Sequence, residues 1–208
     1  MNGEPRHTAL LLIDLQRSFC DDIGAMAKQG RPIRAMQQAA RRCAELGDAA
    51  HGAGVPVIWT RMQFRPDYSD GGRLISDIRP NLAKIGALRA GTLDAAFADG
   101  LGVAPQDIVI EKARYSALYG TSLEVTLRAM QIACIVVGGV TTSMCVESTV
   151  RDLGQRDYEV IVAREACADF DEARHNASLE AMAFGFASVE SLTECRQRLQ
   201  AQKDHMQT

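Results

Sequence analysis

The chain has 208 residues, of which 47% are hydrophobic and 24% are charged, and its formal net charge is −3. This composition is typical of one globular domain with a substantial core, and the small negative charge gives no reason to expect nucleic acid or an anionic membrane as a partner. No apolar run approaches the ~20 residues that a membrane-spanning helix needs. The apolar run near the N-terminus stops at Asp14, which indicates a buried strand rather than a signal peptide.

Three strands and one long helix are predicted in the first half of the chain. Ala9–Ile13 is continuously apolar, as expected for a parallel strand covered on both faces. Ile33–Ala53 is rich in helix formers and is followed by a glycine stop. Val55–Thr60 is the second predicted strand, and Arg61–Pro80 is a long irregular segment of the kind that is often functional. Asp107–Glu111 is the third strand.

The second half continues the alternation of helices and strands. Ser122–Met130 is a predicted helix and Ala133–Val137 is the fourth strand. A helix that begins near Cys145 follows, and then Tyr158–Ala163 forms the fifth strand. Asp171–Phe184 is a predicted helix that a glycine ends.

A short sixth strand near Phe186–Val189 and a solvated tail from Gln197 complete the prediction. Strands separated by helices form right-handed βαβ units, so the fold class is α/β: a three-layer αβα domain with a mostly parallel, six-stranded, Rossmann-like sheet. We expect a single domain over residues 1–208, with terminal segments at about 1–7 and 197–208.

Six cysteines are spread along the chain without a C-x-x-C pair or a Cys/His cluster of zinc-binding spacing. A chain of this length does not need disulfide bonds to compensate for a small core, so we expect reduced thiols and a cytoplasmic protein. Free cysteines are usually small buried side chains. The six are Cys20, Cys43, Cys134, Cys145, Cys167 and Cys195.

Cys145 is the cysteine with the most informative surroundings. An apolar strand ends in Gly138-Gly139, and a short polar turn then leads to Cys145 at the start of a predicted helix. Peptide dipoles and unpaired N–H groups at a helix N-terminus stabilise a thiolate and a neighbouring oxyanion. We therefore interpret Cys145 as a nucleophile, although a cysteine considered alone is more often a buried side chain.

Asp14 and Lys112 also lie directly after predicted strands. The carboxyl ends of parallel strands meet at one edge of a sheet, where ligands bind, so Asp14, Lys112 and Cys145 are expected to converge. A carboxylate can take the thiol proton and later deliver it to a leaving amine, and a nearby ammonium favours the charged forms. No histidine is required, and among the four histidines only His175 remains a further candidate.

Three segments of the sequence resemble signatures of the isochorismatase-like cysteine hydrolases, a superfamily that includes nicotinamidases, N-carbamoylsarcosine amidases and ureido or biuret-type amidohydrolases. The segments are LLIDLQRSF (Leu11–Phe19), IEKARYSALYGTSLE (Ile110–Glu124) and VVGGVTTSMCVESTVRD (Val136–Asp152). The resemblance covers nearly the whole chain. It implies that Asp14 is the general acid/base, Lys112 its charge partner and Cys145 the nucleophile.

The same resemblance implies further features of the site. Family members have a non-proline cis peptide four residues before the cysteine, which here is the bond between Val140 and Thr141. The N–H groups of Thr141 and Cys145 would form the oxyanion hole. Phe19 and Tyr115 occupy positions that line the substrate pocket in relatives, and core packing is the alternative for both.

The sequence differs from some members of the superfamily, and these differences narrow the reactions that it could catalyse. Nicotinamidases hold a metal through an Asp-x-His segment and a second histidine, whereas Trp59–Gly72 contains no histidine, so we expect no metal and no cofactor. Isochorismatases proper lack the cysteine. The metal-free amidase branch remains, and Arg61, Arg65 or Arg73 is a candidate to hold a substrate carboxylate.

The sequence therefore predicts hydrolysis of a C–N bond in a small amide, carbamoyl or ureido compound through a covalent acyl-enzyme. Two alternatives stay open: a nicotinamidase-like or isochorismatase-like hydrolase of another small metabolite, and a non-hydrolytic thiol-reactive or scaffold member of the family. Relatives are commonly dimers or tetramers, so we expect a homo-oligomer. The substrate itself is not evident from the sequence.

Overall fold

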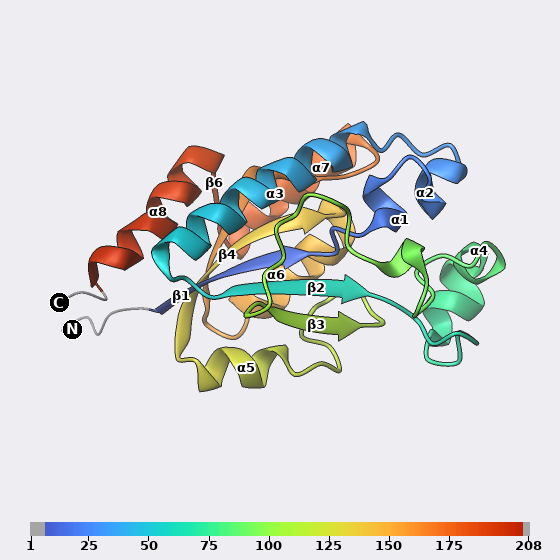
Figure 1. The fold of residues 1–208 in the computed structure, drawn as a ribbon, viewed down its shortest axis with the longest axis horizontal. Coiled ribbons are helices and arrows are strands. Elements are labelled where there is room, and N and C mark those ends of the chain that lie inside the picture. The colour runs from blue at the N-terminus through green and yellow to red at the C-terminus, as the bar shows by residue number, and fades with distance from the viewer. Residues whose placement is uncertain (1–6, 206–208) are drawn as a thin grey trace.

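The centre of the structure, a computed structural model that describes residues 7–205, is a sheet of six parallel strands (Figure 1). Each strand pairs in parallel with its neighbours, and their order across the sheet is β3-β2-β1-β4-β5-β6. The strands are β1 (His7–Ile13), β2 (Val57–Met62), β3 (Ile108–Lys112), β4 (Ile132–Val140), β5 (Glu159–Ala168) and β6 (Ser188–Glu190).

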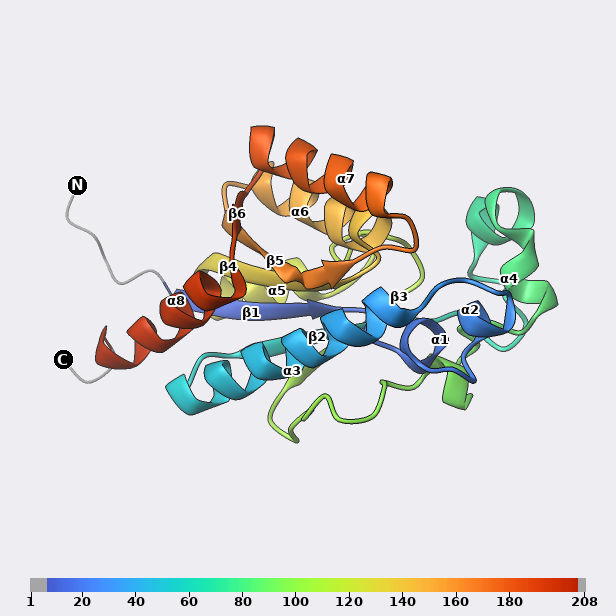
Figure 2. The same cartoon turned by 90° about the horizontal axis from the view of Figure 1, so that it is seen from above.

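Helices cover both faces of this sheet, so the predicted three-layer α/β fold class is confirmed. Figure 2 shows α3 and α8 together on one face, with α6 and α7 on the other. The α-helices are α1 (Arg17–Cys20), α2 (Ala25–Lys28), α3 (Arg34–Ala53), α4 (Pro80–Lys84), α5 (Leu123–Ala129), α6 (Glu147–Gly154), α7 (Glu172–Gly185) and α8 (Leu192–His205). Shorter helical turns are η1 (Leu74–Ile78), η2 (Leu93–Ala95) and η3 (Thr142–Val146).

The strand order places a crevice at the carboxyl ends of β1 and β4. The chain moves from β1 outward to β2 and β3, then returns to lay β4 against the other side of β1. The strand order thus reverses between β1 and β4, which is the position where open α/β sheets bind ligands. At this point Gly139 has φ 133°, and a Cβ there would lie 2.2 Å from the Ile13 carbonyl oxygen. Only glycine allows the two strands to approach so closely.

Burial explains why the central strands could be predicted from sequence. The side chains from Ala9 to Ile13 are completely buried, and the interior of β4 is also buried from Ile135 to Val137. A strand covered on both faces needs apolar side chains in both directions, so its sequence is a continuous apolar run. All six predicted strands are present, with shifted ends. The largest shift is in β5, which continues to Ala168.

Two predictions about local structure were wrong. The segment from Gln197 is not a solvated tail, because α8 continues to His205 and Leu199 is completely buried. The segment 61–80 is not irregular throughout, because β2 extends to Met62 and η1 follows within the same segment. Residues 1–6 and 206–208, which belong to the predicted terminal segments, lie outside the described residues.

All six cysteines lie within the described range, and all are free and buried, as expected. In the range 7–205, no helix has the length and apolar composition needed to cross a membrane.

Candidate active site

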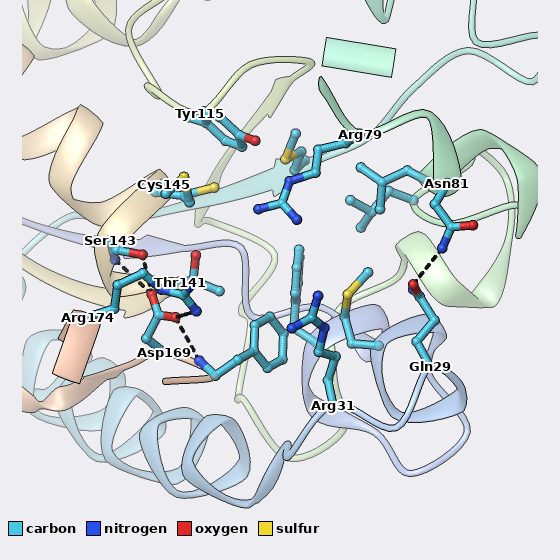
Figure 3. Close-up of a pocket in the computed structure, with 17 residues that line it drawn as sticks. Gln29, Arg31, Arg79, Asn81, Tyr115, Thr141, Ser143, Cys145, Asp169 and Arg174 are labelled. Carbon is cyan, nitrogen blue, oxygen red and sulfur yellow. Dashed lines mark hydrogen bonds and ion pairs between the residues drawn. The ribbon is translucent and has the colours of Figure 1, made fainter. Parts of the chain in front are cut away.

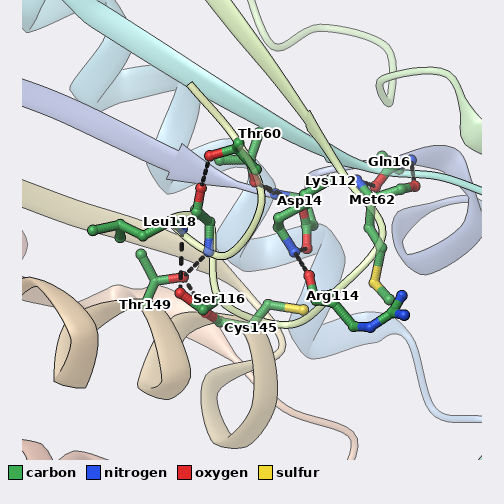
Figure 4. A network of polar contacts seen from close by, with 12 residues as sticks. Asp14, Gln16, Thr60, Met62, Lys112, Arg114, Ser116, Leu118, Cys145 and Thr149 are labelled. Carbon is green, nitrogen blue, oxygen red and sulfur yellow. Dashed lines mark hydrogen bonds and ion pairs between the residues drawn. The ribbon is translucent and has the colours of Figure 1, made fainter. Parts of the chain in front are cut away.

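The three predicted catalytic residues meet at the carboxyl edge of the sheet (Figure 4). Asp14 follows β1, Lys112 is the last residue of β3, and Cys145 lies in η3 just after β4. The Lys112 Nζ atom donates a hydrogen bond of 2.6 Å to the Asp14 Oδ2 atom, and both side chains are fully buried. Residues distant in the sequence thus form one cluster, because parallel strands bring their carboxyl ends together.

The Asp14 carboxylate is held in place by its neighbours. The Thr60 hydroxyl on β2 donates to Asp14 Oδ1 at 2.6 Å, while Lys112 occupies the other oxygen. Lys112 also donates to the Arg114 carbonyl oxygen at 3.1 Å. The backbone of Asp14 is left-handed with φ 52°, a conformation that aspartate adopts more readily than most residues. Each carboxylate oxygen therefore has one donor and keeps further acceptor capacity.

Burial and the neighbouring charges shift the pKa of the Cys145 thiol in opposite directions. Burial raises the pKa of the Cys145 thiol to about 12, although the Lys112 ammonium lowers it. Asp14 also raises the thiol pKa, by its charge and as a hydrogen-bond partner. Burial lowers the pKa of Lys112, but the Asp14 carboxylate and Cys145 outweigh it and raise that pKa above its ordinary value of 10.5. At neutral pH the cluster holds an ammonium and a neutral thiol.

This protonation state differs from the thiolate expected from a helix N-terminus. Cys145 lies inside η3, and the regular helix α6 begins at Glu147. The Cys145 side chain is also buried, and removing a thiolate from water costs more than the nearby ammonium recovers. A neutral thiol needs a base before it can attack, and the Asp14 carboxylate is a hydrogen-bond partner of this thiol.

The peptide bond between Val140 and Thr141 is cis, as the resemblance implied. The Thr141 carbonyl oxygen accepts hydrogen bonds from the Met144 and Val146 N–H groups, both at 3.2 Å, which closes the turn that carries Cys145. No hydrogen bond described for this turn uses the Thr141 N–H group. The predicted role of the Thr141 and Cys145 amides as an oxyanion hole remains a prediction.

A cavity of about 240 Å³ opens in front of Cys145 (Figure 3). Phe19 and Tyr115, the two predicted substrate-binding residues, both lie in its wall. The other lining residues are Met26, Gln29, Arg31, Met62, Arg79, Asn81, Leu82, Leu88, Thr141, Ser143, Met144, Asp169, Phe170 and Arg174. The volume suits a small molecule.

The arginines suggested by the sequence do not line this cavity. Arg61 pairs with Glu111 and lies over the Phe97 ring, 5.7 Å from its centroid. Arg73 pairs with Asp77 at 2.6 Å, and Arg65 is largely exposed. Of the three arginines in the wall, Arg31 and Arg174 come from other segments, whereas Arg79 lies in the same 61–80 segment as the three candidates. All three were missed because no local pattern marks them.

A second buried carboxylate was also missed. Asp169, directly after β5, accepts hydrogen bonds from Ser143 N at 3.0 Å and Ser143 Oγ at 2.6 Å. Arg174 pairs with it at 3.0 Å. Burial opposes ionisation, but the Ser143 and Arg174 contacts outweigh it and hold the pKa of Asp169 below its ordinary value. Asp169 directly follows β5 as Asp14 follows β1, but the predicted fifth strand ended at Ala163, so the same signal did not mark it.

His175, the one histidine kept as a candidate, lies beside the site. Its Nδ1 atom is 2.8 Å from the Thr142 hydroxyl, and His175 is not among the residues that line the cavity. Burial lowers the pKa of His175, which the charge of Asp169 partly opposes. Its neutral ring supports the turn rather than facing a substrate.

Within the described residues, no group of His, Cys, Asp and Glu side chains has a geometry suited to a metal ion. The cavity wall itself holds a single carboxylate, Asp169, whose oxygens are occupied by Ser143, Phe170 and Arg174.

The fold is a three-layer α/β domain that carries a cysteine beside a buried aspartate and lysine at the carboxyl edge of its sheet. The model of the isochorismatase domain matches residues 8–194, and the chain belongs to this family. Among curated proteins, the chain is 34% identical over 191 residues to the ureidoacrylate amidohydrolase RutB of Methylobacterium radiotolerans, covering 85% of this chain and 73% of that protein. It is 35% identical over 173 residues to RutB of Methylorubrum extorquens, covering 76% and 68%.

Solved structures agree with this family. A cysteine hydrolase from Pseudomonas syringae superposes with a TM-score of 0.86 at 30% identity, over 97% of this chain and 96% of that one. N-carbamoylsarcosine amidase from Thermoplasma acidophilum has a TM-score of 0.70 at 23% identity, over 89% and 96%. The second similarity shows a shared fold.

Proposed function

We propose that the protein hydrolyses a C–N bond of a small amide, carbamoyl or ureido compound through a covalent intermediate on Cys145. Membership of the isochorismatase family and the amidohydrolases among its relatives make the chain a hydrolase acting on C–N bonds. The observation that carries the mechanism is the buried Asp14–Lys112 pair behind a cysteine that lines the cavity.

In the proposed first step, Asp14 takes the proton of the Cys145 thiol while the sulfur attacks the substrate carbonyl carbon. The carbonyl electron pair moves to the oxygen, and the N–H groups of Thr141 and Cys145 hold the resulting oxyanion. When the carbonyl re-forms, the C–N bond breaks and Asp14 gives its proton to the leaving nitrogen. Lys112 stays protonated throughout and keeps the carboxylate oriented.

In the second step, water attacks the thioester-type intermediate, and Asp14 takes a proton from that water. The C–S bond then breaks, and the proton on Asp14 returns to the sulfur. The elevated thiol pKa favours this last transfer, because the free enzyme is more stable with a neutral thiol.

The relatives narrow the compounds to test. Because two matched proteins are ureidoacrylate amidohydrolases, we propose that acyclic ureido compounds belong at the head of a substrate panel. Cys145 is the one cysteine in the described cavity wall, so the site has no resolving thiol and a redox function is disfavoured.

The test is a panel of small amides and ureides, including 3-ureidoacrylate, with release of ammonia as the readout. On a compound that the wild type hydrolyses, Cys145→Ala should lose at least about 1,000-fold in kcat, because the nucleophile is removed. Cys134→Ala is the matched control, since Cys134 is buried near the start of β4, at the opposite end from the site. Wild-type turnover by Cys145→Ala would refute the assignment.

A further inference from the structure

The cavity in front of Cys145 carries excess positive charge although the whole chain carries a net charge of −3. Its wall contains Arg31, Arg79 and Arg174 but only one carboxylate, Asp169. Arg174 and Asp169 lie 3.0 Å apart, so their charges offset each other. No described residue forms a side-chain hydrogen bond or ion pair with Arg31 or Arg79. Two guanidinium groups thus remain without a protein partner in the wall of the cavity.

These two arginines come from different segments and extend into the same space. Arg31 lies in the turn between α2 and α3, and Arg79 directly precedes α4. Figure 3 shows both guanidinium groups turned into the cavity, with that of Arg79 on the side where Cys145 lies. Both arginines are exposed. A guanidinium group that faces a cavity without a protein partner is available to an anionic ligand there, and two such groups facing one space favour an anion between them.

A hydrogen bond joins the two segments that carry the arginines. The Asn81 side-chain amide donates to the Gln29 Oε1 atom at 2.7 Å, across the cavity from Cys145 (Figure 3). Gln29 lies two residues before Arg31, and Asn81 lies two residues after Arg79. This exposed bridge links the two segments at the wall of the cavity.

The wall of the cavity also contains apolar side chains. They include Phe19, Met62, Leu88 and Phe170. Apolar side chains offer an anion no hydrogen bonds, so an anion in this cavity would take its hydrogen bonds from polar groups such as the guanidinium groups. The cavity therefore has a reactive end at Cys145 and a cationic end at the arginine pair.

We propose that Arg31 and Arg79 bind a carboxylate, and that the substrate is a small amido or ureido acid. This inference rests on the proposed function, because it places the scissile carbonyl at Cys145. The planar guanidinium group matches a carboxylate with two parallel N–H···O bonds, and two arginines can share the two oxygens. The arginine pair then sets substrate choice and takes no part in bond cleavage.

The experiment compares 3-ureidoacrylate with its methyl ester, which keeps the ureido group and lacks the anion. For Arg79→Gln and for Arg31→Gln, kcat/KM on the acid should fall about 10- to 100-fold, chiefly through KM, because a charge-assisted contact is lost. The preference for the acid over the ester should fall by at least about tenfold. Arg34→Gln is the matched control, since Arg34 is exposed near Arg31 and outside the cavity wall.

Two results distinguish failure of this inference from failure of the proposed function. If the wild type hydrolyses acid and ester equally well, or if Arg31→Gln and Arg79→Gln both keep the preference, the carboxylate site is wrong while the hydrolase stands. If no panel compound is hydrolysed, calorimetric titration with 3-ureidoacrylate replaces turnover. Binding by the wild type that both variants weaken at least tenfold supports the site, and equal or absent binding overturns it.

Discussion

Asp14 and Asp169 begin from the same local pattern and end in different environments. Each follows a buried parallel strand, each side chain is at most 2% exposed, and each pairs with a cation within 3.0 Å. The cation of Asp14 is Lys112, whose side chain is fully buried, whereas that of Asp169 is Arg174, which is 50% exposed. The two carboxylates therefore differ in the burial of their cationic partner, and not in the kind of strand that precedes them.

The hydrogen bonds at the two carboxylates explain what each group can do. Both oxygens of Asp169 are taken up in holding the backbone of Ser143 and Phe170 and the side chain of Arg174. Asp14 has one side-chain donor at each oxygen, and its carboxylate raises the pKa of the neighbouring Cys145 thiol. A carboxylate that is saturated by its own protein supports a turn, while one with spare acceptor capacity can move a proton.

The largest effect expected from this comparison is on turnover by Asp14→Asn. An amide cannot accept the thiol proton, so kcat/KM on a confirmed substrate should fall about 100- to 10,000-fold. Asp169→Asn is the control, and its loss should be much smaller because Asp169 lies outside the proposed proton path. Steady-state kinetics measures kcat/KM of both variants, and thermal unfolding checks that both are folded.

Equal losses in the two variants would contradict the distinction between the two carboxylates. Asp14→Asn also leaves Lys112 buried without its counter-ion. If that variant does not fold, the double variant Asp14→Asn/Lys112→Met removes the unpaired charge. Activity in the folded double variant near that of the wild type would rule out Asp14 as the base.

The cations should differ in their contribution to stability. Lys112→Met leaves the Asp14 carboxylate buried and unpaired, and we expect the free energy of unfolding to fall by about 3–5 kcal/mol. Arg174→Gln removes a half-exposed partner and should cost about 1 kcal/mol or less. Urea unfolding at pH 7 measures both, and a similar cost for the two would show that burial does not separate the pairs.

The smallest expected effect is on the pH dependence of stability in Asp169→Asn. Asp169→Asn should lower the free energy of unfolding by about 1–3 kcal/mol at pH 7, because it weakens the contacts with Ser143 and Arg174. Because the folded pKa lies below the ordinary value of 3.8, the stabilising effect is complete above that pH and disappears as pH falls through the folded pKa.

The wild type and Asp169→Asn should therefore differ by a constant amount from pH 7 down to about pH 5 and converge below pH 3.8. Urea titrations at several pH values measure this difference. A gap between the two proteins that widens in acid would show that the folded pKa is raised instead.

The sequence was most informative where a property is local. The apolar runs of β1 and β4 predict buried strands, because both faces of each strand are covered. The helix α8 was missed although Leu192, Cys195 and Leu199 follow a helical spacing, because polar residues outnumber them in that segment. The fully buried Leu199 shows that those few apolar contacts are sufficient.

By itself, the sequence determined the α/β class, the six strands and the meeting of Asp14, Lys112 and Cys145, since each follows a strand and parallel strands share one edge. Only the tertiary structure decided which arginines line the cavity and that burial keeps the thiol neutral. The physical reason is that strand ends are set by local patterns, whereas desolvation and the partners of a charge depend on side chains brought together from distant segments.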